Sequence, residues 1–235
     1  MKIAMWSGPR NLSTAMMYAF AARGDCAVWD EPFYAPYLAR SDADHPMQAA
    51  ILQAHDTDPR RVATACAGPT PDGAQHWYMK HMPHHMMPDF PLDWAAGCVN
   101  IHLIRHPARV IASYAAKRDR MTLEDIGFPQ QARLWQALPG PVIDAGDVRA
   151  DPARALGRLC AEIGLPFSER MLRWRAGPKP FDGIWAAHWY HAVHRSTGFA
   201  GAEGALPEVP PECRSLLAAA LPIYQAMRAG VGTSP

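Results

Sequence analysis

Cysteine is sparse and scattered in this chain, and no two cysteines form a C-x-x-C pair. The five cysteines stand singly along a sequence of 235 residues. A disulfide framework uses an even set of cysteines at close spacings, and a zinc ribbon uses C-x-x-C pairs. The sequence therefore argues against both and predicts reduced, mostly buried thiols.

Long apolar runs and an excess of one charge are also missing. No apolar run reaches the ~18 residues of a membrane span. The run after Lys2 is too short for a secretory signal, because Pro9 and Arg10 follow it at once. The net charge of +1 gives no electrostatic reason to expect nucleic acid or a membrane surface as a partner. We therefore expect a cytoplasmic protein with neither of these partners.

Five short apolar runs predict buried strands, at residues 2–6, 26–29, 76–81, 99–104 and 142–144. Helices are predicted at residues 15–22, 47–54, 130–138, 152–163 and 213–229, whereas residues 56–76 are typical of a surface loop. This alternation favours an α/β fold, and the length is sufficient for the core of one domain. We expect residues 1–235 to form that single domain, with a C-terminal loop and helix, residues 175–235, packed on it.

The first predicted strand leads through a short polar loop into the first predicted helix, a geometry that directs free backbone N–H groups at an anion. Arg10 adds a cation, and Ser13 and Thr14 add hydroxyl donors. The loop is not the ATPase type, because it lacks the Gly-Lys pair of G-x-x-x-x-G-K-[ST]. From these residues alone, a phosphate-binding loop and a plain strand-to-helix turn both stay open.

Residues 9–14 resemble the 5′-phosphosulfate loop of the sulfotransferases, P-[KR]-S-G-T-T. They agree at four of six places, counting Arg10 as the basic residue and Ser13 as a hydroxyl residue. Asn11 replaces Ser and keeps a polar side chain. Leu12 replaces Gly, which puts a side chain where the family's backbone approaches its ligand closely. The resemblance implies that Arg10, Asn11, Ser13 and Thr14 hold the 5′-phosphosulfate.

A second segment resembles the family's 3′-phosphate motif, in which an Arg at a strand end is followed by a Pro and then by a Ser within a helix. Arg105, Pro107 and Ser113 fit this pattern without gaps. The guanidinium group of an arginine such as Arg105 can bind a phosphate through two parallel hydrogen bonds, and Pro107 suits the first position of a helix. The resemblance implies that Arg105 and Ser113 hold the 3′-phosphate. Arg109 is either a second contact or part of a solvated face.

Two acidic residues follow the second predicted strand. The triplet Asp30-Glu31-Pro32 is similar to one in some bacterial sulfotransferases, where the Glu is placed as the general base. Glu31 is therefore a candidate base, whereas Asp30 is interpreted as a helix N-cap or a loop carboxylate.

Residues 80–88 resemble the cytosolic sulfotransferase segment K-T-H-L-P-x-x-L-L-P, with one residue missing between Lys80 and His81. In that family the His deprotonates the acceptor and the Lys stabilises charge on the phosphosulfate, which makes both residues candidates here. Adjacent residues of a strand point to opposite faces, so Lys80 and His81 would point apart if both belong to the strand.

Together these segments identify the chain as resembling the PAPS-dependent sulfotransferases, as a bacterial member, over residues 1–175. The family resemblance implies a three-layer αβα, P-loop NTPase-like fold with a central parallel sheet of about five strands. It also implies transfer of a sulfuryl group from 3′-phosphoadenosine 5′-phosphosulfate (PAPS) to a hydroxyl or amine of a small acceptor, without a metal. Either Glu31 or His81 would be the base.

Other functions stay open at this point. A P-loop kinase shares the loop but needs a loop Lys and a Mg²⁺-binding Asp. The replacement of the motif's glycine by Leu12 keeps open a protein that binds a nucleotide or a sulfated ligand without catalysing a reaction. A pyridoxal-phosphate transaminase has only Lys80, Lys117 and Lys179 as Schiff-base lysines. Two groups of histidines invite a zinc site, at 76, 81, 84 and 85 and at 188, 191 and 194, but neither shows the partner spacing that zinc sites use.

Overall fold

The computed structural model describes residues 1–42, 45–115 and 121–230, and a five-stranded parallel sheet lies at its centre. The strands are β1 (Lys2–Ser7), β2 (Cys26–Asp30), β3 (His76–His81), β4 (Val99–Ile104) and β5 (Val142–Asp144), in the spatial order β2-β3-β1-β4-β5. Every neighbouring pair is parallel. The five predicted strands are therefore confirmed, and β1 occupies the middle of the sheet.

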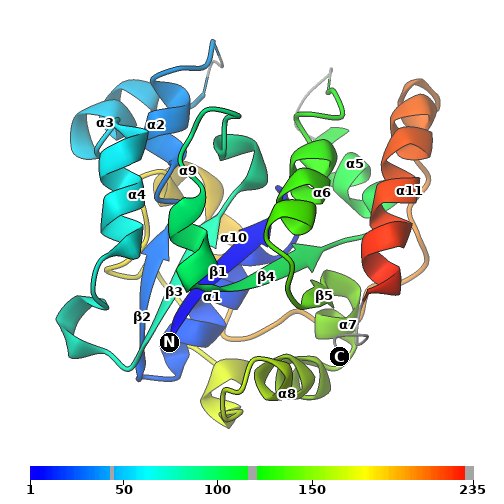
Figure 1. Ribbon diagram of the computed structural model, residues 1–235. Coiled ribbons are helices and arrows are strands. Elements are labelled where there is room, and N and C mark those ends of the chain that lie inside the picture. The colour runs from blue at the N-terminus through cyan, green and yellow to red at the C-terminus, as the bar shows by residue number, and fades with distance from the viewer. Residues whose placement is uncertain (43–44, 116–120, 231–235) are drawn as a thin grey trace.

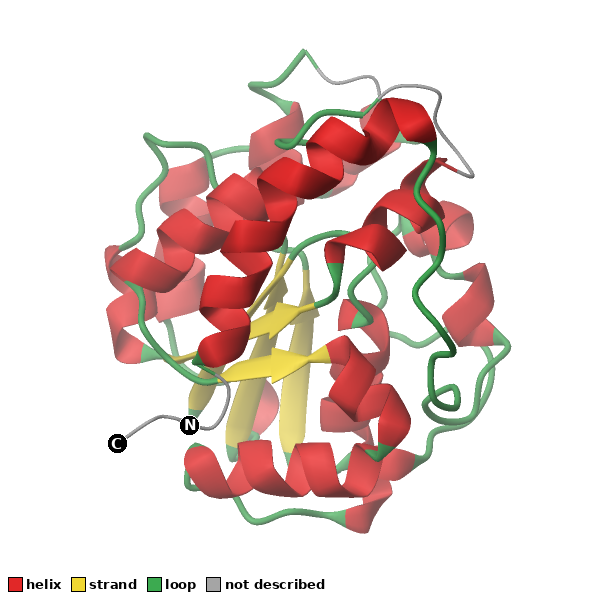
Figure 2. Cartoon of the chain, turned by 90° about the vertical axis from the view of Figure 1, so that its right-hand side faces the viewer, coloured by secondary structure: helices red, strands yellow, loops and turns green. Residues whose placement is uncertain are grey.

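Helices cover both faces of this sheet and give the three-layer αβα fold that the resemblance implied (Figure 1, Figure 2). They are α1 (Ser13–Ala22), α2 (Tyr34–Leu38), α3 (Gln48–Ala54), α4 (Pro59–Ala67), α5 (Pro107–Ala115), α6 (Phe128–Ala137), α7 (Ala145–Ala150), α8 (Pro152–Glu162), α9 (Ala186–Trp189), α10 (His191–His194) and α11 (Arg214–Ala229).

Alternate residues of the central strand enter different cores. Ile3 and Met5 of β1 pack in the cluster that contains α1 and α8, whereas Ala4 and Trp6 pack in the cluster that contains α4 and α6. Both faces of a parallel sheet are buried in this way, which explains why its strands are apolar throughout. Nearly all of α1 is buried as well, so this helix is apolar on every side.

The prediction that residues 56–76 form a surface loop is wrong for α4. The Asp58 carboxylate accepts a hydrogen bond from the Arg60 backbone N–H, and Pro59 occupies the first helical position. Val62 and Cys66 lie one turn apart and are buried against the sheet. The cap and the apolar stripe outweighed the turn-forming residues on either side of the helix.

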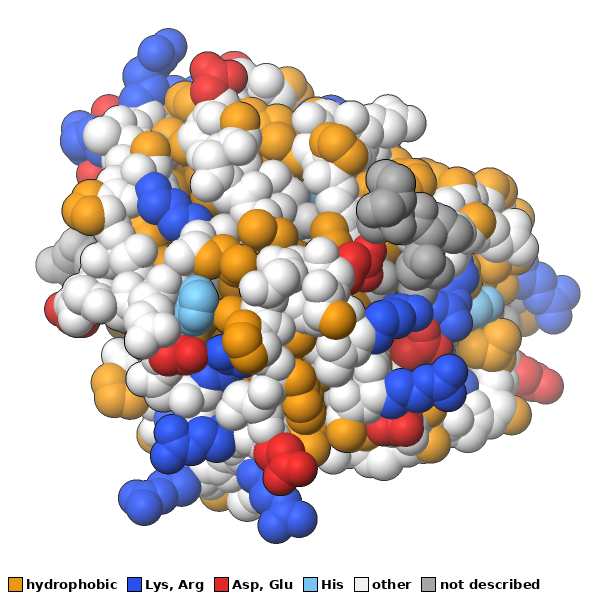
Figure 3. All heavy atoms as spheres, turned by 60° about the horizontal axis from the view of Figure 1, so that its bottom comes forward, with side chains coloured by type: hydrophobic (Ala, Val, Ile, Leu, Met, Phe, Trp, Pro, Cys, Tyr) orange, Lys and Arg blue, Asp and Glu red, His pale blue; other side chains and the backbone are white. Residues whose placement is uncertain are grey.

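The surface carries mixed charge. On the face seen in Figure 3, acidic and basic side chains lie beside one another with hydrophobic side chains among them, as a net charge of +1 leads one to expect. No helix in the described ranges combines the length and the apolar character needed to cross a lipid bilayer.

Two glycines give a matched test of this packing. A Cβ at Gly140 would lie 1.9 Å from the Asn100 carbonyl oxygen at the edge of β4, whereas a Cβ at Gly157 inside α8 meets nothing within 4 Å. Gly140→Ala should therefore lower the free energy of unfolding by about 3 kcal/mol. Gly157→Ala should raise it by about 0.5–1 kcal/mol, because alanine favours a helix interior. Urea denaturation measures both, and equal stabilities of the two variants would contradict the packing described here.

Candidate active site

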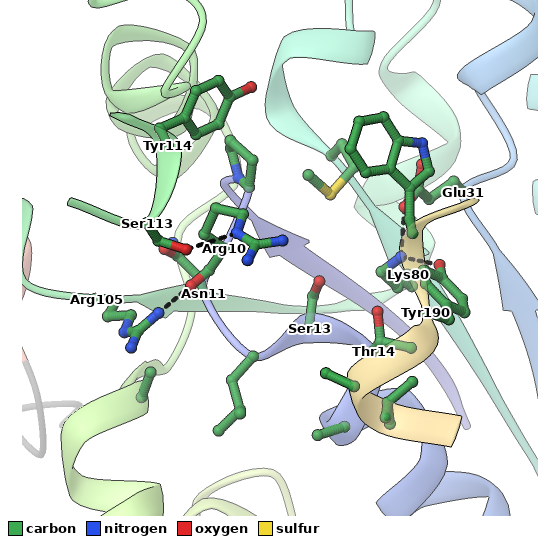
Figure 4. Close-up of a pocket in the computed structure, with 18 of the residues that line it drawn as sticks. Arg10, Asn11, Ser13, Thr14, Glu31, Lys80, Arg105, Ser113, Tyr114 and Tyr190 are labelled. Atoms are coloured by element: carbon green, nitrogen blue, oxygen red, sulfur yellow. Dashed lines mark hydrogen bonds and ion pairs between the residues drawn. The ribbon is translucent and has the colours of Figure 1, made fainter. Parts of the chain in front are cut away.

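A cavity of about 820 Å³ opens at the carboxyl edge of the sheet, where open α/β folds bind ligands. Its walls come from the loop before α1, the ends of β2, β3 and β4, the helices α5 and α7, and the segment that contains α9 and α10. Of the residues predicted for the site, it brings together Arg10, Asn11, Ser13, Thr14, Glu31, Lys80, Arg105 and Ser113. Figure 4 shows Arg10, Arg105 and Ser113 on one side, Glu31 and Lys80 opposite, and Ser13 and Thr14 between them.

The loop between β1 and α1 has a backbone shape suited to an anion. Arg10 and Leu12 both lie in the left-handed region, with φ of 64° and 77°. No side chain caps α1, so the N–H groups of its first turn are available to a ligand. Leu12 takes the conformation that glycine favours at this place in the family motif, and its side chain packs against the core. The departure at Leu12 therefore leaves the turn intact.

The two predicted anion-binding segments touch each other. The Arg10 Nε donates a hydrogen bond to the Ser113 Oγ at 2.8 Å. The Arg105 Nη1 donates to the Arg10 carbonyl oxygen at 2.6 Å, although the two residues are 95 positions apart. The fold thus places two guanidinium groups and a hydroxyl at one end of the cavity.

A buried ammonium group lies at the other end. The Lys80 Nζ donates to the Asp30 Oδ1 at 2.9 Å, to the Tyr190 hydroxyl at 2.6 Å and to the Glu31 carboxylate. Burial by itself would lower the pKa of Lys80, but the charges of Asp30 and Glu31 outweigh it and raise that pKa. Lys80 therefore stays an ammonium ion.

Glu31 has a constrained backbone and a buried side chain. Its backbone is left-handed, with φ of 45°, and its N–H donates to the Lys80 carbonyl oxygen at 2.9 Å. Strained backbone of this kind clusters at functional sites. Burial and the neighbouring Asp30 charge raise the pKa of Glu31, while Lys80 opposes them. The result is a carboxylate with a greater affinity for a proton than an exposed glutamate has.

The interpretation of Asp30 as a helix N-cap or a loop carboxylate is wrong. Besides Lys80, its carboxylate accepts a hydrogen bond from the Tyr190 hydroxyl at 2.8 Å and from the Gly183 N–H at 3.1 Å. Asp30 is buried and joins the end of β2 to the segment before α10. Tyr190 was missed altogether, because nothing in the sequence around it marks a residue that pairs with distant strands.

His81 is the one predicted site residue that the cavity does not include. It follows Lys80 in β3 and points to the opposite face of the sheet, as alternation along a strand requires. There its ring stacks on Trp6, with ring centroids 4.6 Å apart, and contacts Trp94. Neither ring nitrogen has a hydrogen-bond partner among the described residues. Burial lowers the pKa of His81 to about 3, so its ring is neutral.

His84 and His85 line the cavity although neither was predicted to. The His85 Nδ1 lies 3.9 Å from the Glu31 Oε2, and its ring stacks on Tyr34 with centroids 4.5 Å apart. Burial lowers the pKa of His84 to about 4, and burial also lowers the pKa of His85 well below its ordinary value. Their position directly after β3 was a usable signal, since ligands bind beyond strand ends.

The histidine groups do not assemble into a metal site in the described part of the chain. No group of three or more His, Cys, Asp or Glu side chains there is placed to hold a metal ion. His81 stacks on Trp6 in the core whereas His85 lines the cavity, and His194 pairs with Asp182 at 3.1 Å.

Comparisons with known proteins identify the family of the chain. A family model described as a sulfotransferase domain matches residues 1–231. Two Arabidopsis thaliana proteins, branched-chain-amino-acid aminotransferase-like proteins 1 and 2, are 33% and 32% identical over 97% and 96% of this chain. The matches cover 42% and 41% of those proteins, so the chain spans about two fifths of their length. Both relatives are plant proteins, and bacterial membership stays a prediction.

A solved structure, the sulfotransferase domain from the curacin biosynthetic pathway, shares the fold. Its TM-score is 0.54 at 16% identity, and the match covers 99% of this chain and 92% of that one. At this identity the likeness concerns the fold alone.

The burial of His81 has a measurable consequence. The unfolded chain binds a proton at this residue near pH 6.5, whereas the folded chain does so only near pH 3. Stability is therefore lost as the pH falls below 6.5. His81→Phe removes this dependence. The free energy of unfolding of the variant minus that of the parent protein should therefore be about 2 kcal/mol larger at pH 5 than at pH 7.5.

Urea denaturation at the two pH values measures this difference, and any constant cost of fitting the larger ring cancels. His191→Phe is the control, because it makes the same replacement at an exposed histidine. A difference between His81→Phe and the parent protein that is the same at both pH values would contradict the burial of a neutral imidazole.

Proposed function

The chain belongs to the sulfotransferase domain family, and on that premise we propose that it moves a sulfuryl group from PAPS to a hydroxyl or amine of a small acceptor. The observation that carries the proposal is the meeting of two anion-binding segments in one cavity. Arg10 and Ser113, from the first loop and from α5, are hydrogen-bonded at 2.8 Å. A donor with phosphate groups at two positions explains why both segments are needed.

The donor would lie across the N-terminus of α1. Arg10, Asn11, Ser13 and Thr14 would hold its 5′-phosphosulfate, with backbone N–H groups of the helix opposite the negative charge. Arg105 and Ser113 would hold its 3′-phosphate at the cationic end. The transferred group would then face the end that contains Glu31 and Lys80 (Figure 4).

Glu31 is proposed as the general base. A hydroxyl becomes a good nucleophile as its proton leaves, and a buried carboxylate with a raised pKa accepts that proton well. The acceptor oxygen would attack the sulfur in line while the bond from sulfur to the phosphate oxygen breaks. Lys80 would hold Glu31 in place, and Arg10 with the end of α1 would stabilise the departing phosphate oxygen. His81, which points away from the cavity, has no part in this mechanism.

The aminotransferase-like names of the two plant relatives do not alter the proposal. Those names belong to proteins more than twice as long as the matched segment. The Lys80 Nζ is engaged by three partners, and the Lys179 Nζ donates to backbone carbonyl oxygens at 2.7 and 2.9 Å. Lys117 lies outside the described residues. Lys80 and Lys179 therefore do not offer a free amine to an aldehyde.

Donor recognition gives the first test of the proposal. Adenosine 3′,5′-bisphosphate should bind at least tenfold more tightly than adenosine 5′-phosphate, because Arg105 and Ser113 would contact only the former's 3′ group. Arg105→Ala should remove this preference at a cost of about 2 kcal/mol for a lost charge-assisted pair. Titration calorimetry measures both affinities, with Arg60→Ala, at an exposed position of α4, as the control. Equal affinities of the two nucleotides for the parent protein would contradict the proposal.

The identity of the base gives the second test. Glu31→Gln keeps the shape of the side chain but removes its basicity, so turnover with PAPS and a panel of hydroxyl acceptors should fall at least about a hundredfold. In the parent protein, turnover should also fall as the pH drops through the raised pKa of Glu31. His81→Phe should retain turnover. Near-normal turnover of Glu31→Gln would show that Glu31 is not the base, and unchanged nucleotide affinity would show that the variant is folded.

A further inference from the structure

A carboxylate of the chain itself pairs with arginines at the cationic end of the cavity. Glu203 belongs to the segment between α10 and α11, and its side chain is only 6% exposed. Its carboxylate pairs with Arg109 at 2.9 Å, with Arg149 at 2.9 Å and with Arg105. These arginines come from α5, α7 and the end of β4, so three separate elements direct guanidinium groups at one carboxylate.

This arrangement leaves positive charge uncompensated. In the described ranges, every ion pair of the three arginines goes to Glu203, whose single negative charge faces three guanidinium groups. The Arg105 Nε is also buried without a hydrogen-bond partner among the described residues. Phosphate monoesters carry a charge of about −1.5 to −2 near pH 7 and three acceptor oxygens. Such a group would suit the cluster better than a carboxylate does.

The segment that carries Glu203 is weakly attached. Its neighbours on both sides, residues 200–202 and 204–206, are exposed, and Glu203 alone among them turns inward. Two backbone contacts support it, from the Arg149 Nε to the Gly201 carbonyl oxygen at 2.9 Å and from Arg109 to the Gly204 carbonyl oxygen. All of this attachment depends on the same arginines. A segment with so few apolar contacts opens at low cost.

We propose that Arg105, Arg109 and Arg149 form a binding site for the donor's 3′-phosphate, and that Glu203 occupies this site until the phosphate displaces it. The proposal rests on the proposed function, and it adds Arg109 and Arg149 to the residues that contact the donor. Arg105 and Arg149 line the cavity directly. The Glu203 carboxylate and the donor's 3′-phosphate cannot occupy this site together. The apparent affinity for the donor is therefore the intrinsic affinity multiplied by the fraction of molecules in which Glu203 has left the site.

The decisive variant is Glu203→Gln, which keeps the size of the side chain and removes its charge. It should bind adenosine 3′,5′-bisphosphate about tenfold more tightly than the parent protein does, with no change for adenosine 5′-phosphate, which lacks the competing group. Glu208→Gln, an exposed position in the same segment, is the matched control and should change neither affinity. Titration calorimetry measures all of these, and unchanged or weaker binding of the bisphosphate by Glu203→Gln would overturn the proposal.

Arg149→Gln provides a second, opposite test if Glu203→Gln does not fold. When Arg149 contacts the phosphate, its replacement weakens binding of the bisphosphate about tenfold or more. When Arg149 serves only to hold Glu203, its replacement frees the site and tightens binding. Equal or tighter binding by Arg149→Gln would therefore overturn the assignment.

Inorganic phosphate separates this proposal from the proposed function. It should raise the melting temperature of Glu203→Gln more than that of the parent protein or of Glu208→Gln, because it needs only the three arginines. If this occurs while no nucleotide binds, the sulfotransferase proposal fails and the phosphate site stands. The opposite result is that the bisphosphate binds the parent protein, while Glu203→Gln and the parent protein respond equally to the bisphosphate and to inorganic phosphate. In that case the proposed phosphate site is wrong and the proposed function stands.

Discussion

The site depends on one buried charge, the Lys80 ammonium group. Taking an ammonium ion out of water costs several kcal/mol, and only close pairing offsets that cost. Here three parts of the chain meet: Lys80 lies in β3, Asp30 and Glu31 lie at and just after the end of β2, and Tyr190 directly precedes α10. Removal of Lys80 would leave two carboxylates buried side by side, so the strands, the loop after β2 and the C-terminal segment are all constrained by this contact.

The charges are distributed along the cavity in a way that suits transfer of a group between two partners. Arginines gather at one end, the acid and the lysine at the other, and the N-terminus of α1 lies between them (Figure 4). A donor with two anionic groups would span the arginines and the helix end, which leaves the acidic end to the acceptor. Within this layout the Glu203 carboxylate pairs with the arginines at their end of the cavity, where we propose that the donor's phosphate displaces it.

Two departures from the family pattern have different structural outcomes. Leu12 replaces a glycine but takes the left-handed conformation that the turn requires, at a cost of roughly 1–2 kcal/mol. The residue missing between Lys80 and His81 has the larger effect, because it turns the histidine into the core beside Trp6. The replacement of a glycine by Leu12 was absorbed locally, whereas a change of register along a strand moved a side chain across the sheet.

The five strands, their order along the chain and the two segments predicted to bind anions could be read from the amino-acid sequence, because these follow from apolar runs and from residues adjacent in the chain. Which side chains face the cavity depends instead on how distant parts of the chain pack together. In the folded protein His81 points away from the cavity, Asp30 and Tyr190 contact Lys80, and Glu203 pairs with the arginines. The physical reason is distance along the chain: Tyr190 lies 160 positions from Asp30, and no local pattern encodes a pairing that exists only after parallel strands and their connections have packed.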